Sequence, residues 1–249
     1  MLEVGELDAL ARRGSVVHGL DPRAKLVATI LFLVAVVSWG RYEILGLLPL
    51  AAYPLFLCAA GSVPAAFVAK KLLVVSPFAL ALGAFNPLFD TATRAVMGGV
   101  AISGGWLSFA SIAARLALTV AAALALVAVT GMDPLCAAAE RLGAPRLLVS
   151  QVALLYRYLF VLFAEAQRMR RAAQLRSPER GLLSLALFGS LAGHLLLRAL
   201  DRGDRVHRAM RCRGFSCRMP TLRPMRFRPR DAAFVSIWAA FFAAVRVLG

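Results

Sequence analysis

Long apolar runs follow one another along this sequence, and short polar segments separate them. Four of the runs lie at residues 26–39, 44–68, 72–89 and 106–129, and a fifth lies at 231–248. A helix of about 20 apolar residues crosses the hydrocarbon core of a bilayer. The pattern therefore predicts an all-α integral membrane protein with about five transmembrane helices, of which the first is short unless flanking residues extend it.

Residues 130–230 have a different pattern, because apolar positions recur there at helical spacing among many arginines. The spacing predicts a long amphipathic helix from Arg146 to Leu175 and a second from about Gly181 to Arg211. Gly214 is placed to end the second helix in a left-handed conformation. Asp21-Pro22 and Asp133-Pro134 each predict a helix start, with aspartate at the N-cap and proline at the first helical position.

Prolines and glycines predict breaks among the apolar runs. Pro49 and Pro54 are expected to kink the second run. Pro77 and Asn86-Pro87 should interrupt the third, which is expected to be broken or re-entrant near its end. The polar, glycine-rich stretch at 90–105 predicts a small hairpin or turn at the outer surface.

Charge supports the membrane assignment and orients the chain. The 249 residues are 60% hydrophobic and carry a net charge of +16, and residues 130–230 hold 19 arginines against six acids. Basic residues favour the cytoplasmic side of a membrane. The prediction therefore has transmembrane helices at 1–129 with the N-terminus inside, a basic cytoplasmic domain at 130–230, and a transmembrane helix at 231–249 that ends outside. Anionic lipid headgroups and acidic protein surfaces, rather than nucleic acid, are the expected partners of the basic charge.

Two apolar segments inside the basic region leave a second topology open. Residues 147–164 and 182–197 are apolar enough to suggest a transmembrane hairpin, which would give seven spans. That hairpin would put five arginines of its connecting segment outside the cell, against the charge rule. We therefore prefer five spans, with both segments cytoplasmic or lying in the interface.

The sequence offers no evident active site. It has no G-x-x-x-x-G-K-[ST] loop, so it does not bind ATP by that motif, and it has no HExxH or GxSxG motif. Three histidines are scattered and four cysteines form no C-x-x-C pair, so we predict no metal site and no cofactor. Arg115 is the one charge well inside a confident span. It could clamp two helices or contact lipid, but we prefer a side chain that extends to the outer interface.

A short arginine pattern occurs twice in the basic region. Residues 171–177 read RAAQLRS and residues 208–214 read RAMRCRG, so both fit R-A-x-x-x-R followed by a small residue. Each copy ends a predicted helix. Cations at a helix C-terminus interact favourably with its dipole, which accounts for basic residues there in general. The shared spacing also fits arginines that dock into a carboxylate or carbonyl pocket on a partner.

These residues resemble the transmembrane T component of energy-coupling factor (ECF) transporters, in the cobalt-type branch. The resemblance covers essentially the whole chain. It is carried by HGLDPRAKL at 18–26, FNPLFD at 85–90, YRYL at 156–159 and the two signatures Leu175-Arg176-Ser177 and Cys212-Arg213-Gly214. The family's signatures begin with alanine, which Leu175 and Cys212 replace here.

The resemblance implies a non-catalytic transporter subunit in a bacterial inner membrane. Two cytoplasmic ABC-type ATPase subunits would hydrolyse ATP and receive Arg176 and Arg213 in grooves. The neighbouring Ser177 and Gly214 would end the coupling helices and allow close approach. A small membrane-embedded S component would bind the substrate. The residues expected to pack the coupling helices together and contact the S component are Leu159, Leu162, Met169, Leu196 and Leu200.

Cobalt is the substrate that the branch resemblance implies, with nickel or a vitamin as alternatives. A non-transporting membrane scaffold for a peripheral protein is a further alternative. A membrane enzyme that acts on lipid is disfavoured, because no nucleophile or metal cluster is visible in the sequence.

Overall fold

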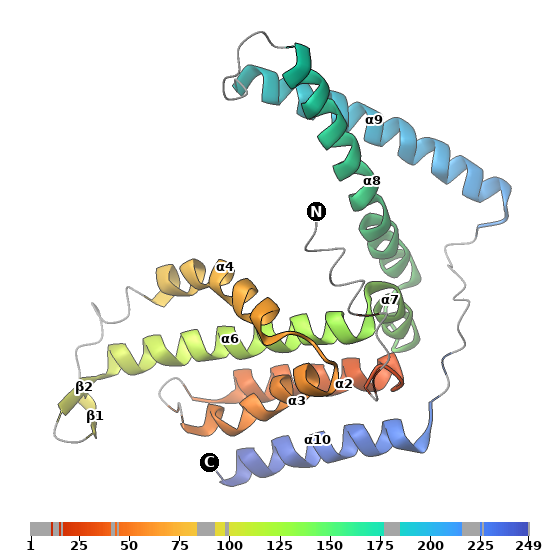
Figure 1. Cartoon of the computed structure of the whole chain (residues 1–249). Coiled ribbons are helices and arrows are strands. Elements are labelled where there is room, and N and C mark those ends of the chain that lie inside the picture. The colour runs from red at the N-terminus through yellow and green to blue at the C-terminus, as the bar shows by residue number, and fades with distance from the viewer. Residues whose placement is uncertain are drawn as a thin grey trace. The chain divides into compact units, whose positions relative to one another are not determined.

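The computed structural model describes residues 11, 15, 17–40, 43, 45–83, 93–97, 100–176, 185–215, 225 and 227–248 (Figure 1). Within these residues the chain forms eight α-helices, two short 3-10 helices and one two-stranded sheet. The chain divides into two compact units. The bundle unit comprises residues 3–138 and 224–249, and the long-helix unit comprises residues 139–223.

Helices of the bundle unit come from both ends of the chain. They are α2 (Pro22–Ser38), α3 (Ala52–Ala60), α4 (Ala65–Gly83), α6 (Gly104–Thr130) and α10 (Pro229–Leu248). The two 3-10 helices, Leu45–Leu47 and Pro49–Ala51, precede α3. Strands β1 (Thr93–Met97) and β2 (Val100–Ser103) pair antiparallel just before α6, which confirms the predicted hairpin.

The second and third apolar runs form helices with other bounds than predicted. Residues 44–68 are not one kinked helix, because α3 ends at Ala60 and α4 already begins at Ala65. The break is a left-handed turn at Ser62, with φ of 53°, and the N–H of Val63 donates to the carbonyl of Cys58 at 2.9 Å. This six-residue closure satisfies carbonyls at the end of α3 and stops the helix.

The prolines act according to their place in each helix. Pro54 lies in the first turn of α3, where a helix needs no N–H donor, so it does not break α3. Pro77 lies inside α4, yet the helix continues to Gly83, which corrects the predicted interruption at Pro77. The loss there is confined to one backbone hydrogen bond. The Asn86-Pro87 pair lies outside the described residues.

Asp21 and Asp231 join the starts of the first and last bundle helices. Asp21 is the N-cap of α2, as predicted, and its carboxylate accepts from the N–H of Arg23 at 3.0 Å. Asp231 accepts from the N–H of Arg228 at 2.7 Å, which caps α10, and from the N–H of Asp21 at 2.8 Å. Both aspartates are buried, at 5% and 3% exposure. One carboxylate thus serves two helix N-termini, where negative charge is favourable.

Lys25 adds the opposite charge to this junction from the end of α6. Its side chain is buried, and its Nζ donates to the carbonyl of Val129 at 3.5 Å. A cation is favourable at a helix C-terminus, where carbonyls lack partners. The starts of α2 and α10 and the end of α6 therefore meet in one polar cluster.

An aromatic cluster fills the bundle around Tyr53. The ring of Tyr53 stacks on Phe32 at 5.0 Å and meets Trp238 edge-on at 4.9 Å. Its hydroxyl lies 2.7 Å from Oγ1 of Thr29, so this fully buried polar group has a partner. α3 approaches α6 closely beside it, because a Cβ at Gly61 would lie 2.4 Å from a methyl of Val129.

Arg115 clamps two bundle helices together. From α6, its guanidinium donates to the carbonyl of Trp39 at 3.0 Å and to that of Gly40, just after the end of α2. The structure thus bears out the helix clamp that the sequence left open as an alternative, because unpaired carbonyls at the end of α2 accept from the cation. On the other side of Trp39, the guanidinium of Arg246 lies 5.2 Å from the ring centre.

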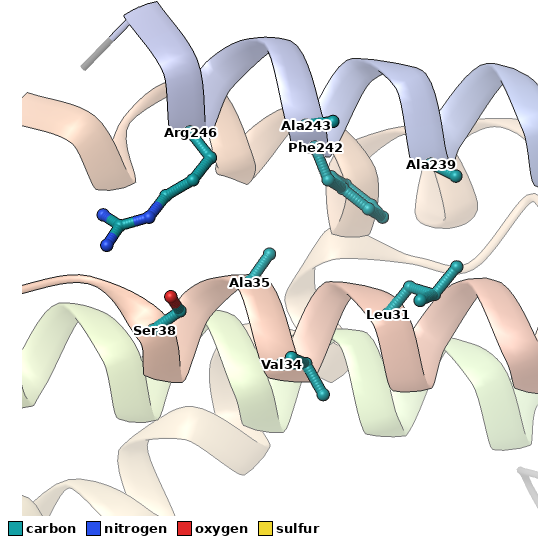
Figure 2. A pocket seen from close by; sticks show the side chains of 8 residues that line it. All are labelled: Leu31, Val34, Ala35, Ser38, Ala239, Phe242, Ala243 and Arg246. Atoms are coloured by element: carbon teal, nitrogen blue, oxygen red, sulfur yellow. The ribbon is translucent and has the colours of Figure 1, made fainter.

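A shallow apolar groove runs between α2 and α10 (Figure 2). Its lining includes Leu31 and Val34 from α2 and Phe242 from α10, and Arg246 lies at one end. The groove carries no cluster of polar groups that would mark a binding site for a polar ligand.

Asp133 and Pro134 begin α7 less neatly than predicted. The helix α7 (Met132–Arg141) starts one residue early, so Asp133 lies in its first turn rather than at the N-cap. The carboxylate is still near the positive end of the helix dipole. Asp133 is exposed, in contrast to the buried Asp231.

Replacement of Asp231 by alanine should strongly destabilise the bundle unit. The buried N–H of Asp21 and the part-buried N–H of Arg228 would lose their acceptor, at a cost of about 2–4 kcal/mol in the free energy of unfolding. Thermal unfolding in detergent should show a Tm lower by about 5 °C or more. Asp133→Ala is the matched control, since it removes an exposed first-turn aspartate. Equal Tm values for the two variants would contradict the role given to Asp231.

Candidate functional site

Two long helices form the core of the long-helix unit. α8 (Arg146–Arg176) has 31 residues and α9 (Leu185–Cys212) has 28. At a rise of 1.5 Å per residue, they are about 46 Å and 42 Å long. The two helices contact each other, and Figure 1 shows that their axes cross at an angle.

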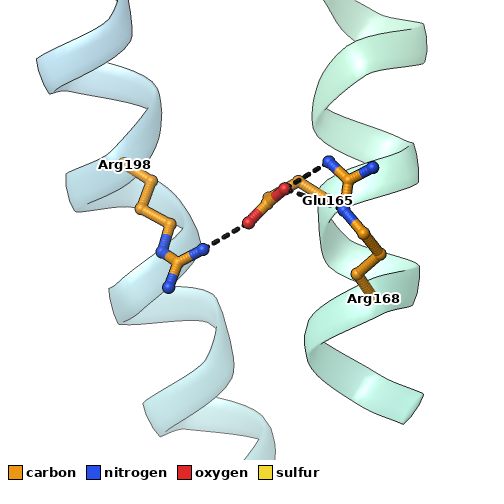
Figure 3. Close-up of polar contacts among 3 residues, drawn as sticks. All are labelled: Glu165, Arg168 and Arg198. Carbon is orange, nitrogen blue, oxygen red and sulfur yellow. Dashed lines mark hydrogen bonds and ion pairs between the residues drawn. The ribbon is translucent and has the colours of Figure 1, made fainter. Parts of the chain in front are cut away.

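Glu165 links the two helices through one carboxylate (Figure 3). It is the one acidic residue of α8. Its Oε2 accepts from Nε of Arg168 on the same helix at 3.1 Å, and its Oε1 accepts from Arg198 of α9. A second contact lies further along, where the guanidinium of Arg202 lies 5.6 Å from the ring centre of Tyr158. The directional contacts between α8 and α9 are therefore polar or cation–π.

The residues predicted to pack the helices together lie in two different environments. Leu162 and Met169 of α8 are half-buried. Leu159 is 49% exposed, and Leu196 and Leu200 of α9 are each 60% exposed. The last three leave apolar surface available to another protein or to lipid.

Sequence reasoning missed which side of α9 faces inward. The half-buried positions of α9 share a spacing of four residues in its first half: Leu187, Leu191, Leu195 and Ala199. That spacing is visible in the sequence as a helical stripe. Apolar residues occupy most positions around this part of α9, so the pattern alone does not choose one stripe.

Both predicted docking arginines lie at helix ends. Arg176 is the last residue of α8 and is exposed, and Leu175 beside it is 82% exposed. Cys212 is the last residue of α9, and the exposed Arg213 follows it in a turn. Ser177 lies outside the described residues. Within the residues described, neither arginine has an ion pair or a side-chain hydrogen bond.

Gly214 ends α9 as predicted. Its φ is +77°, in the left-handed region, and nothing lies within 4 Å of the position a Cβ would take. The N–H of Phe215 donates to the carbonyl of Met210 at 3.0 Å, and that of Gly214 donates to Arg211 at 3.0 Å. This pair of bonds is the Schellman arrangement, with Met210 and Phe215 as its apolar pair. Arg213 is therefore the C-cap residue, and the chain leaves the helix directly after it.

No metal-binding cluster is found in the part of the chain that the structure describes. No group of three histidine, cysteine or acidic residues lies close enough there to hold a metal ion. Cys58, Cys136 and Cys212 are free thiols. Burial, together with the Asp133 carboxylate, raises the pKa of the Cys136 thiol, which keeps it protonated at neutral pH.

By length and composition, two helices of the described residues could cross a membrane. They are α6, with 27 residues, and α8, with 31. α6 was expected to span, whereas α8 spans only in the seven-helix topology.

Comparison with known proteins decides the family. The family model for CbiQ, described as cobalt transport protein, matches residues 13–222. This chain belongs to the CbiQ family. CbiQ proteins are non-catalytic membrane components of cobalt or ECF transport systems, so the chain is a membrane protein and not an enzyme. Within the CbiQ match lie both arginine signatures and both long helices.

One curated relative extends the comparison to the archaea. An uncharacterized protein of Methanocaldococcus jannaschii is 33% identical over 84 residues, which is 33% of this chain and 31% of that protein. The chain thus aligns with about a third of that relative. Its printed name gives no activity.

Two glycine substitutions, one just after the end of α9 and one inside it, should change stability in opposite directions. Gly214→Ala forces a Cβ into a left-handed residue and should lower the free energy of unfolding by about 1 kcal/mol. Gly203→Ala lies inside the exposed helix with nothing within 4 Å of its Cβ position, and should raise it by up to about 1 kcal/mol. Thermal unfolding of both variants in detergent measures this. Shifts of the same sign would refute the role of Gly214 as the left-handed residue that ends α9.

Proposed function

We propose that this chain is the energy-coupling T component of an ECF-type importer. It would pass the movement of two cytoplasmic ABC-type ATPase subunits to a membrane-embedded S component that binds the substrate. The observation that carries the proposal is the pair of long helices in one unit, each ending at an exposed arginine within the same short signature. The CbiQ family supports a transport complex in general.

The helix ends suit a firm contact with a partner. A guanidinium presents five donors in a rigid plane, which matches a carboxylate or a set of carbonyls. Arg176 and Arg213 are exposed and lie at the stiff ends of helices over 40 Å long. A push on such an end moves the whole helix rather than a loop. Leu175 and Cys212, also exposed, extend each docking surface.

The exposed apolar positions suit the S component. Leu159, Leu196 and Leu200 present leucine side chains on surfaces that the long-helix unit does not cover itself. Leu162 and Met169, which are half-buried, would take part in the same surface. Apolar patches of this kind mark sites for protein or lipid contact.

Cobalt is the proposed substrate. The family's printed description names cobalt transport. The residues described here offer no cluster of metal ligands, so in this proposal the ion is held by the S component and not by this chain. Nickel is the first alternative to test, because the same coupling helices could serve either ion.

The proposed topology has five spans in a bacterial inner membrane. α4, α6 and α10 have 19, 27 and 20 residues, which suffices or nearly suffices for a hydrocarbon core of about 30 Å. α2 and the segment from Leu45 to Ala60 are shorter and would need flanking residues. The 19 arginines of residues 130–230 support a cytoplasmic long-helix unit.

Loss of both signature arginines should abolish uptake. Arg176→Ala with Arg213→Ala should reduce ATP-dependent Co²⁺ uptake at least tenfold and weaken co-purification of the ATPase, because a buried charged contact at an interface contributes several kcal/mol. Membrane insertion should be unchanged. The matched control is Arg170→Ala with Arg205→Ala, which removes two exposed arginines from the same helices. Full uptake in the signature variant would rule out docking, and Ni²⁺ in place of Co²⁺ tests the substrate.

Cysteine labelling distinguishes the two topologies. A variant with Ser177→Cys and the four native cysteines replaced by serine should resist a membrane-impermeant thiol reagent added to whole cells. Lysed cells should label fully, which is the control for reactivity. Strong labelling of intact cells would place residue 177 outside and establish the seven-span topology.

A further inference from the structure

The contact between α8 and α9 is narrow relative to the length of the helices. Large apolar side chains on both helices, such as Leu155, Phe163 and Leu197, are exposed rather than packed between them. Apolar packing is not directional, so it sets the angle and register of two helices only where side chains interlock. The position at which these two helices cross therefore depends largely on their polar contacts.

Glu165 is held on both sides. One carboxylate oxygen accepts from Arg168, three residues further along α8, and the other accepts from Arg198 of α9. The Arg168 contact leaves the second oxygen facing α9 (Figure 3). The Glu165 side chain is 23% exposed, against 62% for Arg198, so the acid is the more sheltered partner. A sheltered and oriented carboxylate is a fixed point to which α9 attaches.

We propose that Glu165 is a positioning residue for coupling. It fixes the point at which α8 and α9 cross, and so sets how movement of one arginine tip reaches the other. This inference rests on the proposed function. Arg176 lies 11 residues beyond Glu165, and Arg213 lies 15 residues beyond Arg198. These intervals correspond to arms of about 16 Å and 22 Å at the helical rise.

The Tyr158–Arg202 contact supports the same role. Tyr158 precedes Glu165 on α8, and Arg202 follows Arg198 on α9, as expected for two helices that run in opposite directions. Together, the two contacts fix both the position at which α8 and α9 cross and the angle between them. An exposed ion pair changes an equilibrium by only a few fold, so its loss should alter coupling without unfolding the helices.

The test measures Co²⁺ imported per ATP hydrolysed. The chain is reconstituted in vesicles with the ABC-type ATPase subunits and the S component of the proposed importer. Glu165→Gln should lower this ratio about two- to fivefold, while co-purification of the ATPase stays at the wild-type level. Arg198→Gln should have the same effect, and the double variant should be no worse than either single one. Exchange of the charges, Glu165→Arg with Arg198→Glu, should recover part of the ratio.

Arg205→Gln is the matched control, because it removes an exposed arginine of α9 that has no ion pair among the described residues. Its ratio should equal that of the wild type. An unchanged ratio in Glu165→Gln, or independent effects of the two single substitutions, would overturn this inference alone. A wild-type complex that imports neither Co²⁺ nor Ni²⁺ would overturn the proposed function with it. If Glu165→Gln fails to insert, Arg198→Gln tests the same contact from α9.

Discussion

The bundle unit depends on one buried carboxylate. Asp231 accepts from the N–H of Arg228 and from the N–H of Asp21, which is 210 positions earlier in the chain. A buried backbone N–H without an acceptor costs more than most single contacts contribute, so this acid fixes the last helix beside the first. Lys25 brings in the end of α6 through the carbonyl of Val129. Few other polar groups lie in this region. The cluster is held together because the unpaired backbone N–H and C=O groups of the helix ends bond to the buried side chains.

The opposite end of α2 follows the same principle. Carbonyls at Trp39 and Gly40 receive Arg115 from α6, and Arg246 of α10 stacks on the Trp39 ring. Between these two polar ends, Tyr53 and its aromatic neighbours fill the interior. Polar contacts at both ends set the register of the helices, and apolar packing between them supplies most of the buried area.

The long-helix unit differs from the bundle unit, because its polar contacts lie at the surface rather than in the interior. Its directional contacts are exposed and polar, at Glu165 with Arg198 and at Tyr158 with Arg202, while many of its leucines face outward. In the proposed function this unit moves relative to its partners, and weak, reversible internal contacts would permit that movement. Among the described residues, helix stiffness holds the two arginine tips in place, and the Schellman turn at Gly214 adds to this for Arg213. These properties fit a part that transmits motion rather than one that binds a substrate.

Features that depend on nearby residues were predictable from the amino-acid sequence. Helical periodicity and charge predicted the membrane class and the two long helices, Asp21-Pro22 predicted the start of α2, and Gly214 predicted the end of α9, since caps and turns act within a few residues. Contacts between residues far apart in the chain were not predictable and became visible in the folded structure. It placed Asp231 on Asp21, joined Arg115 to the end of α2, and selected Leu191 and Leu195 instead of Leu196 as the inner stripe of α9. Each of these contacts depends on which donors, acceptors and apolar faces come together in the folded chain. A pattern of neighbouring residues does not contain that information.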